Sequence, residues 1–419
     1  MGHHHAPGDI KVPIKTKRLL VVALVPFLVA TAAGMMWLWP SGDVDIGRAG
    51  FAAREYEASV TDVTRRECPD VPGQEEFVCS TATVTLAEGE DQGESFEIEY
   101  STGPRTRTIQ EGDRVIVATA QEGSVPSPAP GQPEPPKYFF MDFDRRAPLV
   151  GLGITFALVV IALSRWRGLA ALAGVAISLL VLVQFVLPAI LEGSDPLLVA
   201  IVGGSAIMFL ALYLAHGFNV ATTTAVLGTL ASLFLTGALA WFFVDVSIFT
   251  GAGSEEAAFL QISQSQVNLQ GLLLASIIIG TLGVLDDVTV TQSSAVWELY
   301  RADPGFKVRD LYRAAVRIGR DHIASTVNTL VLAYAGASLP LLILFSVSER
   351  PLTQILNTET VAEEIVRTLV GSIGLVASVP ITTGLAALVV TSSTRASSPR
   401  RREKGFRVPR GEREFRDDA

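Results

Sequence analysis

Apolar residues gather into long stretches along this chain. Each stretch is close to the roughly 20 residues that an α-helix needs to cross a hydrocarbon layer of about 30 Å. The stretches are Leu19–Trp39, Leu149–Ser164, Leu169–Leu191, Leu197–Ala215, Val220–Val244, Leu272–Ala295, Ile323–Val347 and Ile365–Thr391. We therefore expect a mostly α-helical membrane protein with about eight transmembrane helices. Residues 19–39 would form a transmembrane anchor, and residues 148–393 a domain of seven helices.

Residues 40–123 show a different pattern, in which apolar side chains recur at every second position. Tyr56, Ala58 and Val60 alternate with polar residues, and so do those of Phe96–Tyr100. This period is typical of half-buried β-strands. The segment is therefore predicted to be one small β-barrel or sandwich of about five or six strands.

Residues 124–147 connect this β domain to the second apolar stretch. Six prolines among the thirteen residues of Ser124–Pro136 predict an extended spacer. The aromatic residues Tyr138–Phe140 are expected at the membrane surface. Arg145 and Arg146 are expected to pair with neighbouring aspartates.

Basic residues indicate the orientation, because positive charge resists translocation. Lysines and arginines precede the first stretch within residues 1–18 and follow the last one within residues 394–419. Both tails are therefore predicted to be cytoplasmic, and the β domain extracytoplasmic, in a bacterial plasma membrane. The basic C-terminal tail is explained by this rule and by anionic lipid. We expect a lipid bilayer as its partner and no nucleic acid.

The net charge of -9 conceals this polarity across the membrane, since acidic residues are concentrated in the β domain. The chain's two cysteines, Cys68 and Cys79, also lie there. In an oxidising compartment we expect them to form a disulfide. The alternative, unpaired or metal-binding thiols, lacks further ligands nearby.

Two adjacent carboxyl groups, Asp286 and Asp287, lie within the sixth apolar stretch. A charged side chain in the middle of a bilayer costs about 2.5 to 3.5 kcal/mol, so each requires a reason. Helical spacing places Asp287 with Thr291 and Ser294 on one stripe, and Asp286 with Thr289 on a neighbouring one. Together they form a wide polar face.

The next apolar stretch supplies further polar groups, among them Asn328. Oxygen donors of this kind suit a hard cation or a proton relay, so Asp286 and Asp287 are candidate metal ligands. The candidate path for an ion or solute consists of Asp286, Asp287, Thr289, Thr291, Gln292, Ser294 and Asn328. The alternative is that these groups only hold helices together, with the aspartates reaching toward cytoplasmic water.

The segment Leu285–Gln292, taken with the exported domain and with Asp142–Arg146 before the second stretch, resembles the YibE/F-like family of bacterial multi-pass membrane proteins. The resemblance covers roughly Leu19–Ser393. It implies the multi-pass architecture and the importance of Asp286 and Asp287. It implies no substrate.

Two classes of function follow from these observations. The leading hypothesis is a transporter or permease for a small ion or solute, with a proton or a divalent cation as substrate. The alternative is an envelope anchor or scaffold that transports nothing and whose β domain binds a partner protein; a homo-oligomer is also left open. We expect no enzyme and no cofactor, because the chain has no phosphate-binding Gly-rich loop, no His-Glu-x-x-His pair and no Gly-x-Ser-x-Gly motif.

Overall fold

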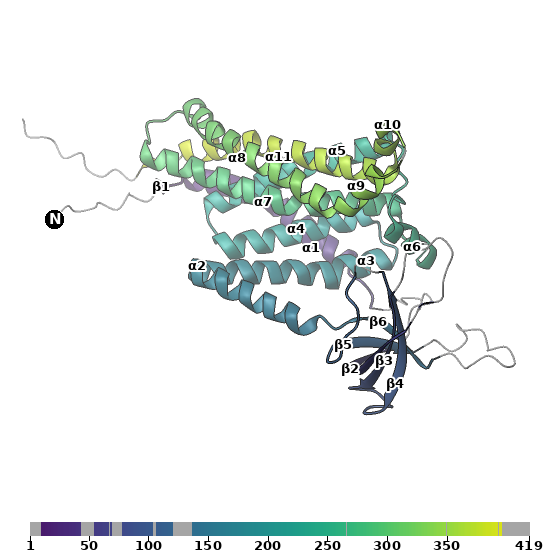
Figure 1. Ribbon diagram of the computed structural model, residues 1–419. Coiled ribbons are helices and arrows are strands. Elements are labelled where there is room, and N and C mark those ends of the chain that lie inside the picture. The colour runs from purple at the N-terminus through teal and green to yellow at the C-terminus, as the bar shows by residue number, and fades with distance from the viewer. Residues whose placement is uncertain are drawn as a thin grey trace, which may run out of the picture.

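The computed structural model describes residues 10–42, 54–66, 68, 78–103, 106–119, 136–264, 266–348, 350–392 and 394–395. These residues form a layered helical domain and a small curled β domain at one end of it (Figure 1). Most of both predicted tails and most of the proline-rich spacer lie outside the described residues.

The helical domain contains a few long helices and several short ones. In chain order these are α1 (Ile14–Trp37), α2 (Arg146–Val181), the π-helical turn η1 (Leu182–Val186), α3 (Leu187–Leu191), α4 (Pro196–His216), α5 (Val220–Val246), α6 (Glu255–Ser263), α7 (Leu269–Ala302), α8 (Val308–Ala337), α9 (Leu339–Ser346), α10 (Leu352–Leu356) and α11 (Glu359–Thr391). Within the described residues, six helices are long and apolar enough to cross a membrane when α2, η1 and α3 count as one. The pair α8 and α9, bent by 66°, would be a seventh.

The helix α2 is interrupted at Arg165, whose φ of 52° and ψ of -128° are not helical. A Cβ atom added to Gly168 would lie 2.5 Å from the carbonyl oxygen of Val160. Residues eight positions apart in a straight helix would be separated by about 12 Å. The chain therefore folds back at Arg165, and Figure 1 shows the two arms. They correspond to the predicted stretches Leu149–Ser164 and Leu169–Leu191.

The helices α5, α7 and α11 pack on one another at the centre of the domain. On one side α8 covers α11 and α7, and on the other α4 packs between α7 and α2. The helix α1 lies against α4 and α5. Glycines permit close contacts: a Cβ added to Gly203 of α4 would be 2.6 Å from Val186, and one added to Gly34 of α1 would be 2.7 Å from Val202.

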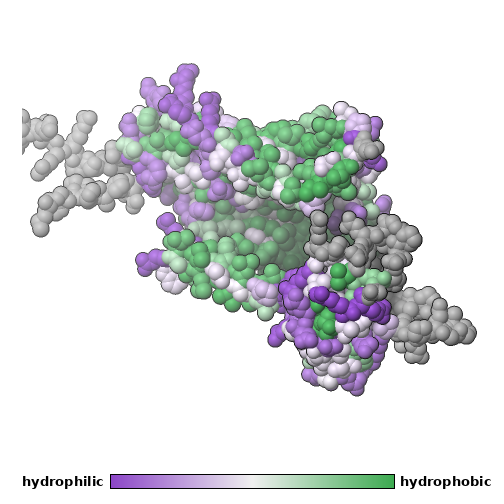
Figure 2. All heavy atoms as spheres, in the orientation of Figure 1, coloured by the Kyte–Doolittle hydropathy of each residue, from purple (hydrophilic) through white to green (hydrophobic). Residues whose placement is uncertain are grey.

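The two ends of the helical domain differ. The strand β1 (Ile10–Lys11) pairs with β7 (Thr394–Arg395), and the hydroxyls of Thr16 and Ser392 are 2.9 Å apart. Both termini of the described chain therefore meet at one end, here named the terminal end. The β domain lies at the opposite end, the β-domain end (Figure 1). Figure 2 shows apolar surface over the helical layers between them and hydrophilic atoms toward both ends.

The β domain is one antiparallel sheet with strand order β4-β3-β2-β5-β6. Its strands are β2 (Glu55–Arg66), β3 (Val78–Leu86), β4 (Ser95–Thr102), β5 (Arg114–Thr119) and β6 (Tyr138–Phe143). The sheet curls so that its two edge strands meet, with the rings of Tyr100 and Phe140 4.7 Å apart. Inside the curl, Val84, Ile98 and Val115 have no exposed surface. The period-two pattern thus predicts the strands of this core.

The strand β6 differs from the prediction, which ended the β domain at residue 123 and placed Tyr138–Phe140 at a membrane surface. Tyr138 is buried, and its hydroxyl donates a hydrogen bond of 2.6 Å to Asp91. Burial, together with this acceptor, raises the pKa of Tyr138. A short aromatic stretch suits an edge strand as well as an interface, and here it completes the apolar core of the sheet.

The disulfide prediction is confirmed, since Cys68 is bonded to Cys79 with a Cα–Cα distance of 5.2 Å. Cys79 belongs to β3, and Cys68 lies just beyond the end of β2. The bond therefore joins β2 and β3 at the base of the loop that connects them.

The predicted pairing of the two arginines is confirmed too. Arg145 lies 2.6 Å from Asp142, and Arg146 lies 2.8 Å from Asp144. Hydrogen bonds from these arginines lower the pKa values of both aspartates. Arg146 also forms an ion pair with Glu57 of β2. The first residue of α2 is thus attached to the sheet.

Replacing both cysteines by alanine in the full-length protein should weaken the β domain alone. A disulfide across this short loop stabilises by about 2 to 3 kcal/mol, which corresponds to a rise of about 30- to 150-fold in amide exchange rate in β2 and β3. Hydrogen exchange with mass spectrometry measures these exchange rates, and the rates in α11 serve as the internal reference. Unchanged exchange in β3 would show that the bond contributes nothing to the stability of the sheet.

Candidate functional site

The interior stripe of α7, defined as Asp286, Thr289, Gln292 and Ser293, faces the centre of the helical domain. Thr289 and Gln292 have no exposed surface, and Ser293 is also buried. Polar groups in such a position need hydrogen-bond partners within the protein. The neighbouring helices α5 and α11 supply most of them.

On the α5 side, the hydroxyl oxygens of Thr229 and Thr289 are 2.7 Å apart. The Ser293 hydroxyl donates a hydrogen bond of 2.8 Å to the carbonyl oxygen of Ala221. These two contacts lie about one turn apart along α7. They fix the register of α7 against α5.

On the α11 side, the Thr383 hydroxyl donates a hydrogen bond of 2.9 Å to Oε1 of Gln292. The Nε2 atom of the same amide is buried and has no hydrogen-bond partner among the described residues. A Cβ added to Gly319 of α8 would lie 2.5 Å from this Nε2. Gln292 is thus enclosed by α8 and α11.

Asp286 is the one member of the interior stripe that carries a carboxyl group. The hydroxyl of Thr229 lies beside it, and no charged side chain of the described residues lies close enough to compensate it. Its Oδ1 atom is buried and has no hydrogen-bond partner among the described residues. An ionised carboxylate without a partner is unfavourable in such surroundings.

The exposed stripe of α7 consists of Asp287, Thr291, Ser294 and Glu298. Across its whole length, α7 exposes no large apolar side chain. The surrounding helices do, for example at Leu214 of α4, Phe234 of α5, Leu332 of α8 and Leu369 of α11. The exposed surface of α7 is therefore suited to water or to a polar partner, whereas that of its neighbours is suited to lipid.

The helical domain is hollowed on the face shown in Figure 2. The recess lies between the layer of α8 and α9 and the layer of α2. Figure 1, in the same orientation, draws α4 and α7 between these layers.

Asp286 and Asp287 do not converge on one point, because neighbouring residues of a helix are about 100° apart around its axis. One carboxyl group belongs to the interior stripe and the other to the exposed stripe. Among the residues that the structure describes, no three His, Cys, Asp or Glu side chains gather where they could hold a metal ion. The geometry gives no support to a cation shared by the two aspartates.

Asn328 was predicted to join the path from the following helix. It lies exposed on α8, and within the described part of the chain no hydrogen bond connects it to either aspartate. The partners that sequence reasoning missed are Thr229 of α5 and Thr383 of α11. A signal for α5 exists in the spacing of Thr229, Ser232 and Thr236, three hydroxyls on one helical face.

The hydroxyls of Thr229, Ser232 and Thr236 of α5 are fully buried and bind carbonyl groups of their own helix. Ser232 donates to Gly228 and Thr236 donates to Ser232, each at 2.8 Å. Glycines let α11 come close to them: a Cβ on Gly374 would lie 2.0 Å from the Thr236 hydroxyl oxygen. The centre of the domain is thus closely packed, and among its buried polar atoms that have no partner in the described part of the chain Asp286 Oδ1 belongs to the one carboxyl group, beside the Thr382 hydroxyl and the Gln292 amide nitrogen.

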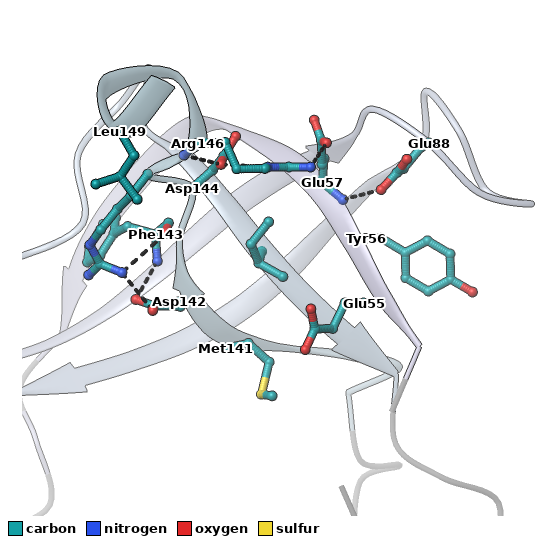
Figure 3. A pocket seen from close by; sticks show the side chains of 12 residues that line it. Glu55, Tyr56, Glu57, Glu88, Met141, Asp142, Phe143, Asp144, Arg146 and Leu149 are labelled. Carbon is teal, nitrogen blue, oxygen red and sulfur yellow. Dashed lines mark hydrogen bonds and ion pairs between the residues drawn. The ribbon is translucent and has the colours of Figure 1, made fainter. Parts of the chain in front are cut away.

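A second cavity lies at the junction of β2, β6 and the start of α2 (Figure 3). Its volume is about 620 Å³. Tyr56, Met141 and Leu149 give it apolar surface. Glu55 also lines it and has no ion pair among the described residues. The paired residues Arg145 and Arg146 line it as well, so the cavity combines apolar surface with charged surface in which carboxylates outnumber arginines.

Substituting Gly374 by alanine should disrupt the α5–α11 contact, because the added methyl group overlaps the Thr236 hydroxyl. We expect a loss of about 1 to 3 kcal/mol in the free energy of unfolding. Unfolding of the purified protein by heat or by SDS measures it. The matched control is Gly283→Ala, where a Cβ meets no atom within 4 Å and stability should not fall. Equal stability of the two variants would contradict this packing.

A family model described as YibE/F-like protein matches residues 152–392. The match includes α2 from Leu152 onward and the whole of α7 and α11, and covers more than half of the 419 residues. No curated protein and no solved structure matches the chain. The chain belongs to the YibE/F-like family.

Proposed function

We propose that this protein is a transporter for a small ion or solute, embedded in a bacterial plasma membrane. Its spans would be α1, the two arms of the α2–α3 segment, α4, α5, α7, the α8–α9 pair and α11. The terminal end would be cytoplasmic, since the basic residues before α1 and at the start of α8 lie there. The β domain would then be extracytoplasmic, where its disulfide is stable.

The observation that carries the proposal is the uncompensated carboxyl group of Asp286 in the central helix. Its buried Oδ1 has no partner, although the hydroxyls around it are satisfied. Keeping such a group in the interior of an apolar domain is costly, and intramembrane carboxyls of this kind mark ion and proton pathways. Asp286 would bind the transported species or the coupling ion.

The exposed stripe, on another face of α7, also supports the proposal. Asp287, Thr291 and Ser294 offer oxygen atoms where a helix facing lipid would present apolar side chains. In this proposal the stripe conducts water or solute toward Asp286. Thr289 and Gln292 would hold α7 in register beside it.

Replacing Asp286 by asparagine should reduce flux at least tenfold, because the amide keeps the size of the side chain but cannot bind a proton or balance a cation. Purified protein in liposomes, with an internal pH dye and a panel of mono- and divalent cations, measures the flux. Glu256→Gln, an exposed change on α6, is the matched control and should leave it unaltered.

Asp287→Asn belongs in the same flux experiment, because it distinguishes the role of the exposed stripe from that of the interior stripe. We expect a partial loss of flux, since Asp287 lies along the route and does not bind in the interior. Unfolding temperatures of all variants show whether a loss of flux is a loss of folding. Wild-type flux in a well-folded Asp286→Asn protein would refute the proposal.

The cavity of the β domain favours a second candidate function, an envelope scaffold that transports nothing. Its mixture of apolar and negative surface suits a basic, amphipathic segment of a partner protein. A photo-crosslinking residue in place of Met141 should capture that partner in intact cells. Under this candidate, Glu55→Gln should weaken the crosslink while Asp286→Asn leaves it unchanged.

A further inference from the structure

Two glutamates begin α11 at the β-domain end, one turn apart, and both face the loop that follows α5. Glu359 accepts three hydrogen bonds from this loop: from the backbone N–H of Thr250 at 2.6 Å, from the Thr250 hydroxyl at 2.8 Å and from the N–H of Gly251 at 2.9 Å. It thereby fastens the loop to α11. Three donors on one carboxyl group favour its ionised form.

Glu363, unlike Glu359, has a buried carboxyl oxygen that receives no hydrogen bond from the part of the chain that the structure describes. Its side chain is only 8% exposed, and its Oε1 atom is buried without a hydrogen-bond partner among the described residues. The carboxyl group packs against Gly253, where an added Cβ would lie 3.0 Å away. An unpartnered buried oxygen is far less costly on a neutral carboxylic acid than on a carboxylate.

The two carboxyl groups lie one helical turn apart on α11, at positions i and i+4, and both face the same loop. Two ionised carboxylates so placed repel each other. Glu359 already binds donors of the loop, whereas Oε1 of Glu363 has no hydrogen-bond partner among the described residues, so Glu363 is the carboxyl group that is favoured as the neutral acid.

The other charged groups nearby do not replace this proton. Arg367 is the nearest cation on α11, and it forms an ion pair of 2.7 Å with Glu364. Tyr334 of α8 approaches the same pair. The loop itself supplies only backbone and hydroxyl groups, and Glu255 and Glu256 of α6 are exposed.

We propose that Glu359 and Glu363 form a proton-binding site that fastens the loop Thr250–Gly253 to α11. The site deepens the proposed function by naming the proton as the ion that the protein senses or couples to on the β-domain side. Loss of the proton leaves two adjacent carboxylates, whose repulsion releases the loop.

The loop is also in contact with the first turn of α7, the helix that carries Asp286. A Cβ added to Gly251, whose φ is +78°, would lie 2.4 Å from the carbonyl oxygen of Leu269. The Gln270 amide donates a hydrogen bond of 3.1 Å to the carbonyl oxygen of Phe249. Movement of the loop therefore reaches the end of α7 directly.

Hydrogen exchange of the loop in the full-length protein, in lipid nanodiscs between pH 5 and pH 9, tests the site without any flux assay. After correction for the intrinsic pH dependence, wild-type exchange in residues 249–253 should rise at least tenfold as the proton is lost. Glu363→Gln keeps this side chain neutral at every pH, so its loop should stay protected throughout. Glu364→Gln is the control and should retain the wild-type dependence.

Constant wild-type protection over this pH range would overturn the proposal, and so would a Glu363→Gln loop that opens as the wild type does. If the Glu363→Gln variant is unstable, the pH dependence of loop exchange in the wild-type protein alone decides whether the proposal holds. The flux assay with Asp286→Asn tests transport separately from the proton site. A pH-dependent loop in a protein without flux supports the proton site and refutes transport. Flux in a protein whose loop does not respond to pH supports transport and refutes the proton site.

Discussion

The close approach of α5, α7 and α11 is the constraint on which the helical domain depends. Gly374 and Gly228 carry no side chain where α11 and α5 meet, so the hydroxyls of Thr236 and Thr382 occupy that space. Side chains this close and this deeply buried leave no volume for rearrangement. The hydroxyls of Thr229, Ser232 and Thr236 bind carbonyl groups of their own helix, whereas the buried Thr382 hydroxyl has no hydrogen-bond partner among the described residues. The close packing makes the three helices one rigid unit.

Asp286 acquires its properties from this unit. A threonine can satisfy its hydroxyl with a carbonyl group one turn back, as Thr289 does with Asp286. A carboxylate has no proton to donate and finds few N–H groups in a helix interior, where the backbone donors are already bound. The same packing that satisfies the Thr229 and Thr289 hydroxyls thus leaves Oδ1 of Asp286 without a hydrogen-bond partner among the described residues.

Much of this arrangement can be predicted from the sequence, because apolar length and period determine the elements. The helices, the disulfide and the separation of Asp286 from Asp287 on two stripes follow from spacing alone. The partners of Asp286 do not: sequence order suggests the next helix, whereas packing brings α5 and α11 to α7. Strand β6 was missed because a short aromatic segment is compatible with both an edge strand and a membrane surface.

The helix α7 connects the two proposed sites. Its first turn touches the loop that Glu359 and Glu363 hold, and its middle carries Asp286 between the rigid partners α5 and α11. A helix clamped along one side moves as a whole or not at all, since its hydrogen bonds and packed side chains resist local bending. A change in protonation at the β-domain end would then act on Asp286 by moving α5, α7 and α11 as one unit relative to α4 and α8. Each occupied site would favour one position of this unit, and the coupling between them would be reciprocal.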